Sequence, residues 1–154
     1  MGFSPLIEPE SLALYNFTLQ HNFSLIIAYH TQGKEIYWNY QNINPPRGLE
    51  IAKKFSNVSG YSVADVPFNA SFAGYKDWFI LNYNRPGYTI EAGFGKNPLP
   101  INQFNEIYNN NLGILVLGLV ESQNKSWIKS SLFWFSLFLF YNFFSLIFVH
   151  CIHC

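Results

Sequence analysis

The sequence predicts an α/β fold, because segments with strand composition alternate with segments of helical periodicity. The apolar run 23–29 has the length of a strand, and the segment 88–92 has strand composition. Prolines precede segments whose apolar residues recur at helical spacing, as at helix starts. The length of 154 residues suits one domain of ordinary size.

The first half of the chain contains a helix and two strands in this interpretation. A helix begins near Pro9, and its apolar residues share one face: Leu12, Leu14, Tyr15 and Leu19. We expect the run 23–29 to be a strand buried on both faces, as in a helix-covered sheet. A polar turn at 30–33 ends it, and 35–38 could form a second short strand.

Two further helices and a strand follow before the last helix. The segment 45–59 begins with two prolines and predicts a helix that closes before a glycine. A short helix over 74–80 is broken at 85–87, and the strand 88–92 comes next. The last helix begins after Pro100 and carries five apolar residues: Phe104, Ile107, Tyr108, Leu112 and Leu115.

The composition excludes several classes of protein. Nine basic and nine acidic side chains cancel, so the basic patch that nucleic-acid binding needs is missing and no nucleic-acid partner is expected. A hydrophobic content of 49% excludes intrinsic disorder. Both cysteines, Cys151 and Cys154, lie in the last four residues, which excludes a disulfide scaffold. No signal peptide is recognisable at the start of the sequence.

The chain divides into a globular segment, 1–125, and an apolar tail, 126–154. Within the tail, 130–149 are twenty consecutive uncharged residues, enough to cross a bilayer as a helix. The flanking Lys125 and Lys129 would then favour a cytoplasmic globular part on a membrane anchor. Frame-shifted translation of AT-rich DNA gives similar runs. A buried core helix is disfavoured, because a small domain cannot cover so many uncharged residues.

Two polar residues stand where the predicted strands end, namely His30 and Glu91. Ligands collect at the carboxyl ends of strands in α/β sheets. A neutral imidazole there could bind zinc, and a nearby carboxylate could take a proton from metal-bound water. Pattern alone favours the alternative, a capped histidine and a solvated glutamate.

Five short motifs lie in order along the chain: Tyr29–Gly33, Ile36–Trp38, Ala73–Phe79, Arg85–Glu91 and Asn97–Pro100. In order and spacing they resemble the zinc carboxypeptidase family, closest to the bacterial γ-D-glutamyl-L-diamino acid endopeptidases, which cut peptidoglycan stem peptides. The resemblance runs from about Ser4 to about Leu119. It implies part of a mixed-sheet zinc carboxypeptidase-like fold with helices on both faces. The apolar tail, expected to form a C-terminal helix, has no counterpart in that family.

The resemblance also implies a metallopeptidase mechanism with one Zn²⁺ ion. His30 occupies the place of the third zinc ligand, and Glu91 that of the general base. Zinc would polarise the scissile carbonyl and acidify a bound water, whose proton Glu91 would take and pass to the leaving amine. The implied substrate is a peptidoglycan stem peptide or muropeptide, cut at its γ-D-glutamyl-diaminopimelate bond.

Two basic residues are more speculative substrate-binding candidates. Lys76 could pair with the second carboxylate of diaminopimelate, or could be a solvated helix lysine. Arg85 could bind a carboxylate as well, although shaping the turn before Pro86 fits it better. Asp77 and Trp78 fit packing and capping better than catalysis.

Part of the family's site has no counterpart in this sequence. None of the four histidines begins the His-x-x-Glu pair that supplies the other zinc ligands, and 67–72 lacks the tyrosine that closes over substrate in many relatives. One imidazole cannot hold catalytic zinc, because such sites use three protein ligands. The chain therefore resembles a carboxy-terminal half that needs a complementing N-terminal half to catalyse. The alternative is a non-catalytic, membrane-attached remnant.

Overall fold

The computed structural model describes residues 5–67 and 74–123, which form a four-stranded sheet with helices on both faces. The predicted α/β class and the mixed sheet are therefore confirmed. The tail 126–154, with its expected apolar helix and possible membrane anchor at 130–149, lies outside the described residues. Among the helices that the structure describes, none combines the length and apolar character needed to span a membrane.

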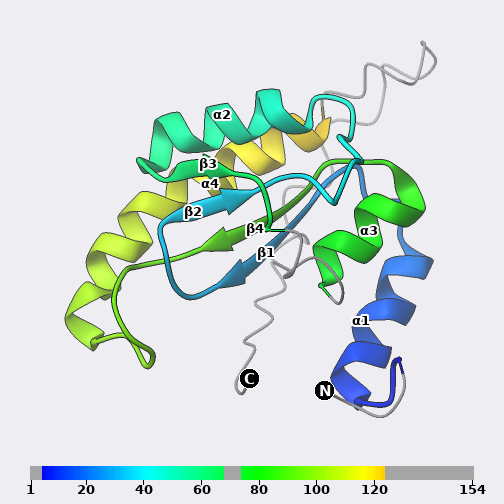
Figure 1. The fold of residues 1–154 in the computed structure, drawn as a ribbon, viewed down its shortest axis with the longest axis horizontal. Coiled ribbons are helices and arrows are strands. Elements are labelled where there is room, and N and C mark those ends of the chain that lie inside the picture. The colour runs from blue at the N-terminus through cyan, green and yellow to red at the C-terminus, as the bar shows by residue number, and fades with distance from the viewer. Residues whose placement is uncertain (1–4, 68–73, 124–154) are drawn as a thin grey trace, which may run out of the picture.

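The sheet has the strand order β1-β4-β2-β3 and mixes both directions (Figure 1). Its strands are β1 Ile26–His30, β2 Glu35–Tyr37, β3 Ser62–Ala64 and β4 Gly87–Glu91. Strands β1 and β4 are parallel, as are β2 and β3, whereas β2 and β4 are antiparallel. Strand β3 is absent from the sequence-based prediction.

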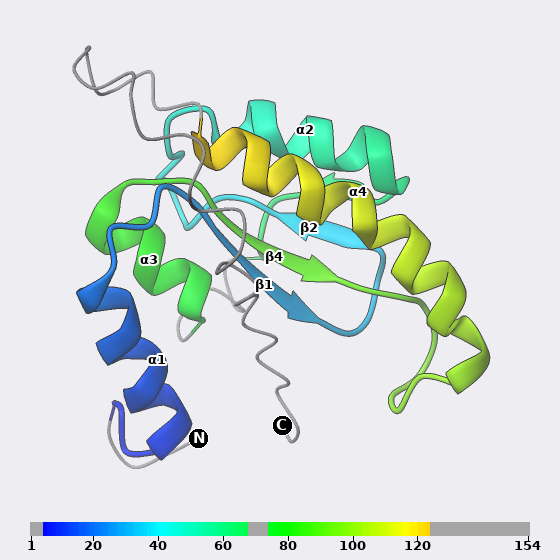
Figure 2. The same ribbon diagram turned by 180° about the vertical axis from the view of Figure 1, so that it is seen from behind.

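The helices form a layer on each face of the sheet, as Figures 1 and 2 show from opposite sides. Helices α2 Gly48–Ser59 and α4 Phe104–Gln123 lie together over one face, and the short 3₁₀ helix η2 Ile101–Gln103 leads into α4. Helix α3 Tyr75–Tyr83 packs on β1 and β4 from the other face. Helix α1 Pro9–Gln20 lies beside α3.

Local sequence explains where two of these helices end. The residue after α2, Gly60, has φ of 74°, a left-handed conformation that glycine adopts without steric cost. Asn84 closes α3 in the same left-handed region, with φ of 46°. Both stops turn the chain toward a strand, so the two capping residues help to place β3 and β4 in the sheet.

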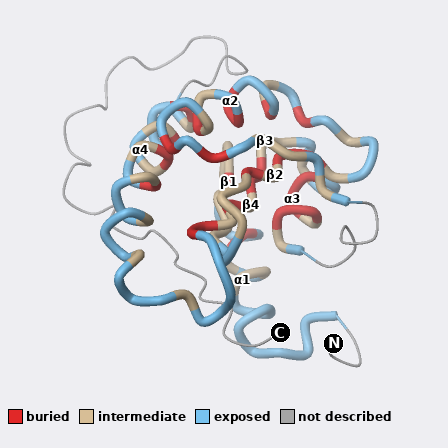
Figure 3. The backbone as a smooth tube through the Cα atoms, turned by 60° about the vertical axis from the view of Figure 1, so that its left-hand side comes forward, coloured by how far each residue is buried: buried red, intermediate tan, exposed pale blue. Residues whose placement is uncertain are grey.

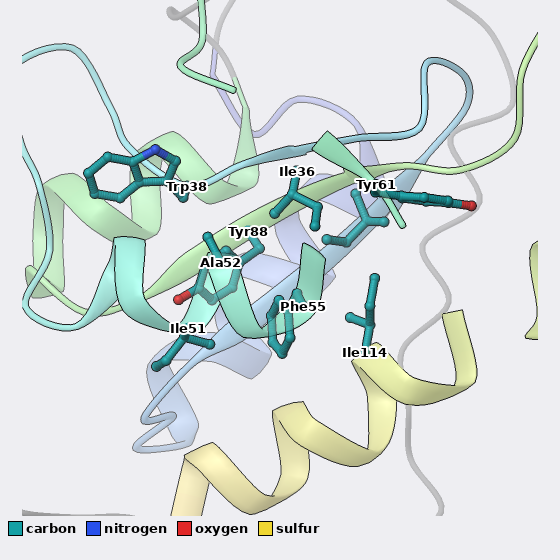
Figure 4. Close-up of a cluster of buried hydrophobic side chains, with 9 residues drawn as sticks. Ile36, Trp38, Ile51, Ala52, Phe55, Tyr61, Tyr88 and Ile114 are labelled. Carbon is teal, nitrogen blue, oxygen red and sulfur yellow. The ribbon is translucent and has the colours of Figure 1, made fainter. Parts of the chain in front are cut away.

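The hydrophobic core lies between the sheet and the α2–α4 layer (Figure 4). Its buried members come from α2, α4, β2 and β4, or lie directly beside β2 or β3: Ile36, Trp38, Ile51, Ala52, Phe55, Tyr61, Tyr88, Ile90 and Ile114. The rings of Phe55 and Tyr88 meet edge to face at 5.0 Å between centroids. The Tyr88 hydroxyl also donates to the Gly48 carbonyl at 3.0 Å, so this buried polar group is satisfied.

A buried carboxylate joins the two helices of this layer. Glu121 on α4 accepts from Arg47 Nη2 at 2.5 Å and from Lys54 Nζ at 2.7 Å. Its side chain is only 4% exposed. Hydrogen bonding to Lys54, followed by that to Arg47, lowers the pKa of Glu121. The carboxylate is thus held ionised by two cations at the junction of α2 and α4.

Strand β1 differs from the expectation of burial on both faces. Only Ile26 is buried, residues 27–29 are half-buried, and His30 is exposed. The reason is position, because within the described chain β1 pairs with β4 alone and forms an edge of the sheet. The apolar run is therefore a strand, as predicted, but one that is covered incompletely.

Candidate active site

His30 and Glu91 lie side by side at the carboxyl ends of two parallel strands. They are the last residues of β1 and β4 and are direct partners in the register of the pair. The backbone N–H of Ala92 donates to the His30 carbonyl at 2.8 Å and holds the two strand ends together. Directly paired residues of neighbouring strands point to the same face of a sheet. The two side chains therefore share one face, away from the core.

Glu35 extends this polar row on the other side of Glu91. It opens β2 and is the antiparallel register partner of Glu91. The Tyr37 hydroxyl donates to Glu35 Oε2 at 2.5 Å. A Cβ atom placed on Gly33 would lie 3.6 Å from both Glu35 Oε2 and Glu91 Cβ, so the turn before β2 also borders these carboxylates. The row His30–Glu91–Glu35 thus crosses three adjacent strands.

The surroundings of the row shift its pKa values in directions that suit chemistry near neutral pH. Burial raises the pKa of Glu91, and the neighbouring charge of Glu35 adds to the effect. Desolvation by the surrounding protein lowers the pKa of His30, although the side chain reaches solvent. Chiefly through its hydrogen bond to Glu35, Tyr37 has a pKa raised to about 12. A neutral imidazole beside a carboxyl group of raised pKa is the result.

This arrangement brings together two groups of the kinds that hydrolytic chemistry can use. A neutral imidazole can be a metal ligand, and a half-buried carboxylate of raised pKa can accept a proton from water. Within 5–67 and 74–123, however, no group of three His, Cys, Asp or Glu side chains is placed to hold a metal ion. The described residues alone therefore do not bring together the three protein ligands that a catalytic zinc site uses.

Lys76 lies at the other end of the same strands. Its Cγ would be 3.4 Å from a Cβ atom at Gly87, where β4 begins. Gly87 and Glu91 are the two ends of the five-residue strand β4, which at ~3.3 Å per residue puts them about 13 Å apart. The Lys76 ammonium donates to the Asn39 carbonyl and pairs with Asp77 Oδ1 at 2.5 Å.

The burial of Lys76 corrects one of its two interpretations. The side chain is 3% exposed, so the alternative of a solvated helix lysine is wrong. Burial also lowers its pKa, against the opposing effect of Asp77. The substrate-binding role stays a prediction, since Lys76 already has two protein partners at a distance from Glu91.

Arg85 is likewise occupied at the amino ends of the strands. Its Nη1 donates to Asn22 Oδ1 and to the Phe23 carbonyl, both at 2.7 Å. The guanidinium also lies over the ring of Tyr83, 5.8 Å from the centroid. These contacts join the segment before β1 to the turn before β4, which matches the expected role of shaping that turn. A role for Arg85 in binding substrate stays a prediction.

The residues next to Lys76 pack as expected, whereas the expected capping role is not seen, because the N-cap of α3 has no side-chain hydrogen bond among the described residues. Asp77 is buried against Lys76, and Trp78 packs against the rings of Tyr15, Tyr75 and Tyr83 at centroid distances of 5.3–6.1 Å. Neither side chain is brought to the His30–Glu91 pair. Most of the segment 67–72, where a closing tyrosine was sought, lies outside the described residues.

Sequence reasoning missed Glu35 and Tyr37 as neighbours of the site. Both were assigned to a short strand without a chemical role. Their proximity to Glu91 depends on β2 pairing antiparallel with β4, which places Glu35 opposite Glu91. A usable signal was present, because Glu35 begins a strand directly after the glycine turn that follows His30.

Two curated proteins are similar in sequence over most of this chain. Gamma-D-glutamyl-L-diamino acid endopeptidase 1 of Lysinibacillus sphaericus is 47% identical over 118 residues, covering 77% of this chain and 29% of that protein. The uncharacterized protein YqgT of Bacillus subtilis is 46% identical over 114 residues, covering 74% and 30%. The chain thus spans about three-tenths of the length of these relatives. No family model matches the sequence.

Two solved structures share the fold at 17% sequence identity. Carboxypeptidase A from Helicoverpa armigera superposes with a TM-score of 0.65, over 79% of this chain and 36% of that one. Bovine thrombin-activatable fibrinolysis inhibitor, solved with a tick carboxypeptidase inhibitor, gives 0.63 over 79% and 47%. The predicted resemblance is therefore confirmed: the chain has a carboxypeptidase-like fold and is related in sequence to part of a γ-D-glutamyl-L-diamino acid endopeptidase.

Proposed function

We propose that this chain is part of the catalytic domain of a zinc peptidase that hydrolyses the γ-D-glutamyl-diaminopimelate bond of peptidoglycan stem peptides. The observation that carries the proposal is the register of His30 with Glu91 at the carboxyl ends of β1 and β4. The name of the Lysinibacillus relative, which is 47% identical, supports the bond and substrate class.

In this proposal each residue of the pair has one task. His30, kept neutral by its lowered pKa, is one ligand of the metal. Glu91 takes the proton of the attacking water, for which its raised pKa suits it, and then delivers the proton to the leaving amine. A bound zinc ion would polarise the scissile carbonyl and lower the pKa of a bound water.

The remaining ligands must come from outside the described residues. Catalytic zinc sites use three protein ligands, and the described residues bring no such group together. A complementing segment would supply them next to the carboxyl end of β1. The proposed activity therefore belongs to the assembled domain.

A complementation assay tests this function. The full chain is mixed with the part of the Lysinibacillus endopeptidase that the alignment leaves uncovered, and a γ-D-glutamyl-diaminopimelate peptide is offered with zinc. We expect hydrolysis in the mixture, little in either component alone, and little on an α-linked glutamyl isomer. Equal cleavage of both isomers would refute the proposed bond, and inactivity of a mixture that forms a complex would refute the proposed chemistry.

The second candidate is a non-catalytic, membrane-attached remnant of such a peptidase. The missing group of three metal ligands among the described residues favours it. A non-catalytic remnant does not need His30 and Glu91 to be placed so that they can act together in catalysis. Inactivity of the mixture together with a failure to bind zinc would support the remnant.

A further inference from the structure

Glu35 is a carboxylate on the same face of the sheet as Glu91, and it has no cationic partner. It begins β2, within the sheet that lies between α2 and α3 in Figure 3, and it is half-buried. None of the ion pairs among the described residues includes it. Lys34, the nearest cation in the sequence, is bound instead to Glu106 on α4, at 2.5 Å. A carboxylate that is partly withdrawn from water without a cation favours a cationic ligand.

The Tyr37 hydroxyl holds this carboxylate in place. It donates to Glu35 Oε2 at 2.5 Å, and no described group donates to Oε1. The same hydrogen bond is the main reason that the pKa of Tyr37 is raised to about 12, so the donor keeps its proton at neutral pH. Tyr37 is the register partner of Thr89, two residues before Glu91 on β4. The Glu35–Tyr37 pair therefore runs along β2 from the level of Glu91 to that of Thr89, ~7 Å away, and leaves one carboxylate oxygen open to a ligand.

The proposed class of substrate contains a cation of suitable reach. The Lysinibacillus relative is named for a bond between γ-D-glutamate and an L-diamino acid. One amino group of the diamino acid forms this bond, and the other remains free and is protonated near neutral pH. In diaminopimelate and in lysine the two amino groups are separated by the same carbon chain, whose extended length is close to that of two strand residues, ~7 Å.

We infer that Glu35 determines the specificity of the proposed peptidase for a diamino acid, by accepting a hydrogen bond from its second ammonium group. The inference rests on the proposed function, because that function places this residue of the substrate next to Glu91. A charge-assisted bond of this kind is stronger than one between neutral groups. The cation also reduces the repulsion between Glu35 and Glu91, which are direct partners across β2 and β4. Lys76 and Arg85, the other candidates for substrate binding, carry the same sign of charge as the ammonium, so neither can bind it.

Peptides that differ in one amino group test this role in the complemented mixture. A γ-D-glutamyl-lysine peptide is compared with its norleucine counterpart, which has the same side-chain carbons without the amino group, and with its Nε-acetyl-lysine counterpart, which has no charge. Lysine lacks the second carboxylate of diaminopimelate, so the predicted role of Lys76 does not affect the comparison. Values of kcat and KM are measured for the unmodified chain, for E35Q, and for E10Q, whose glutamate is exposed on α1 and serves as the control.

We expect the unmodified chain and E10Q to favour the lysine peptide over the other two by ~10–10² in kcat/KM, mainly through a lower KM. E35Q should raise KM for the lysine peptide, reduce the preference to within about threefold, and leave the norleucine peptide unchanged. Y37F keeps the carboxylate but removes the hydroxyl that holds it, so part of the preference should be lost. This second variant tests the role even if E35Q does not fold.

Equal kcat/KM values for the three peptides with the unmodified chain would overturn the inference. An equal loss of kcat on all three peptides in E35Q would overturn it too, because Glu35 would then act only through Glu91 or through the fold. A mixture that cleaves none of the peptides would refute the proposed function and the inference with it. A mixture that cleaves all of them without preference would refute the inference alone.

Discussion

Glu91 and Glu121 are carboxylates withdrawn from solvent in two parts of the molecule, and their pKa values are shifted in opposite directions. Glu121 lies between α2 and α4, where hydrogen bonds to Lys54 and Arg47 lower its pKa. Glu91 lies at the carboxyl end of β4, where burial and then the charge of Glu35 raise its pKa. Among the described residues no ion pair involves Glu91.

The contrast distinguishes charged side chains that stabilise the fold of this chain from charged side chains that are available for catalysis. Both carboxylate oxygens of Glu121, the ammonium of Lys76 and the Nη1 of Arg85 are bound to other protein groups. The carboxylate of Glu91 has been desolvated without a compensating cation. A carboxylate of this kind contributes less to the stability of the fold, but it is better suited to accept a proton.

The largest expected effect is on catalysis. In the complemented mixture, E91Q should lower kcat/KM by ~10²–10⁴, because the proton acceptor is removed while the shape of the side chain is kept. E121Q, its matched control in the α2–α4 layer, should retain the rate to within a few-fold. Initial rates on the γ-D-glutamyl-diaminopimelate peptide measure both. Equal loss in the two variants would break the contrast between the carboxylates.

The next largest effect is on the free energy of unfolding and concerns Lys76, which lies near the start of β4. K76M removes the buried cation and leaves Asp77 without its ion-pair partner, so the free energy of unfolding should fall by ~3–5 kcal/mol. K53M, on the exposed side of α2, should change it by less than about 0.5 kcal/mol. Urea denaturation of the full chain compares them. A stable K76M protein would free Lys76 for the predicted role in substrate binding.

A smaller effect should appear as a dependence of stability on pH. The pKa of Glu121 is lower in the folded chain than its ordinary value of 4.5. Its stabilisation is therefore fully present above about pH 4.5 and is lost as the pH falls through the folded pKa. E121Q should cost about 1–2 kcal/mol at pH 7 and should flatten the fall in urea midpoint below pH 4.5. An unchanged acid profile, with E10Q on α1 as control, would argue against a structural Glu121.

A last effect, similar in size to that of E121Q, concerns Arg85. R85A removes two hydrogen bonds to the segment before β1 and should cost about 1–2 kcal/mol. R85K should restore only part of this, because one ammonium cannot copy the guanidinium geometry. Thermal unfolding of the three proteins measures the series. In the complemented assay, a rise in KM for R85A without loss of stability would instead assign Arg85 to substrate binding.

The fold was largely predictable because its elements have local signals. The proline-led helices, the glycine after α2 and the two apolar strands all appear close to their expected positions. The juxtaposition of His30 and Glu91 also follows from sequence, once two strands are taken as parallel and their carboxyl ends meet at one edge.

Other features depend on contacts that sequence alone does not display. Glu35 reaches Glu91 only because β2 reverses its direction and pairs with β4, which no local pattern records. The burial of Lys76 is compensated by a hydrogen bond that its ammonium donates to the carbonyl of Asn39, a residue distant in sequence. The exposure of β1 depends on which strands lie beside it, and the residue types in β1 do not carry that information.

Zinc stoichiometry shows whether His30 and Glu91 are this chain's contribution to a metallopeptidase site. Zinc is measured in the purified full chain alone, in the complemented mixture, and in mixtures made with H30N or with H21N, a histidine on the outside of the fold. We expect almost no zinc in the chain alone, about one equivalent in the mixture, loss of zinc with H30N and retention with H21N. Tight zinc in the chain alone, or one equivalent retained by H30N, would contradict this expectation.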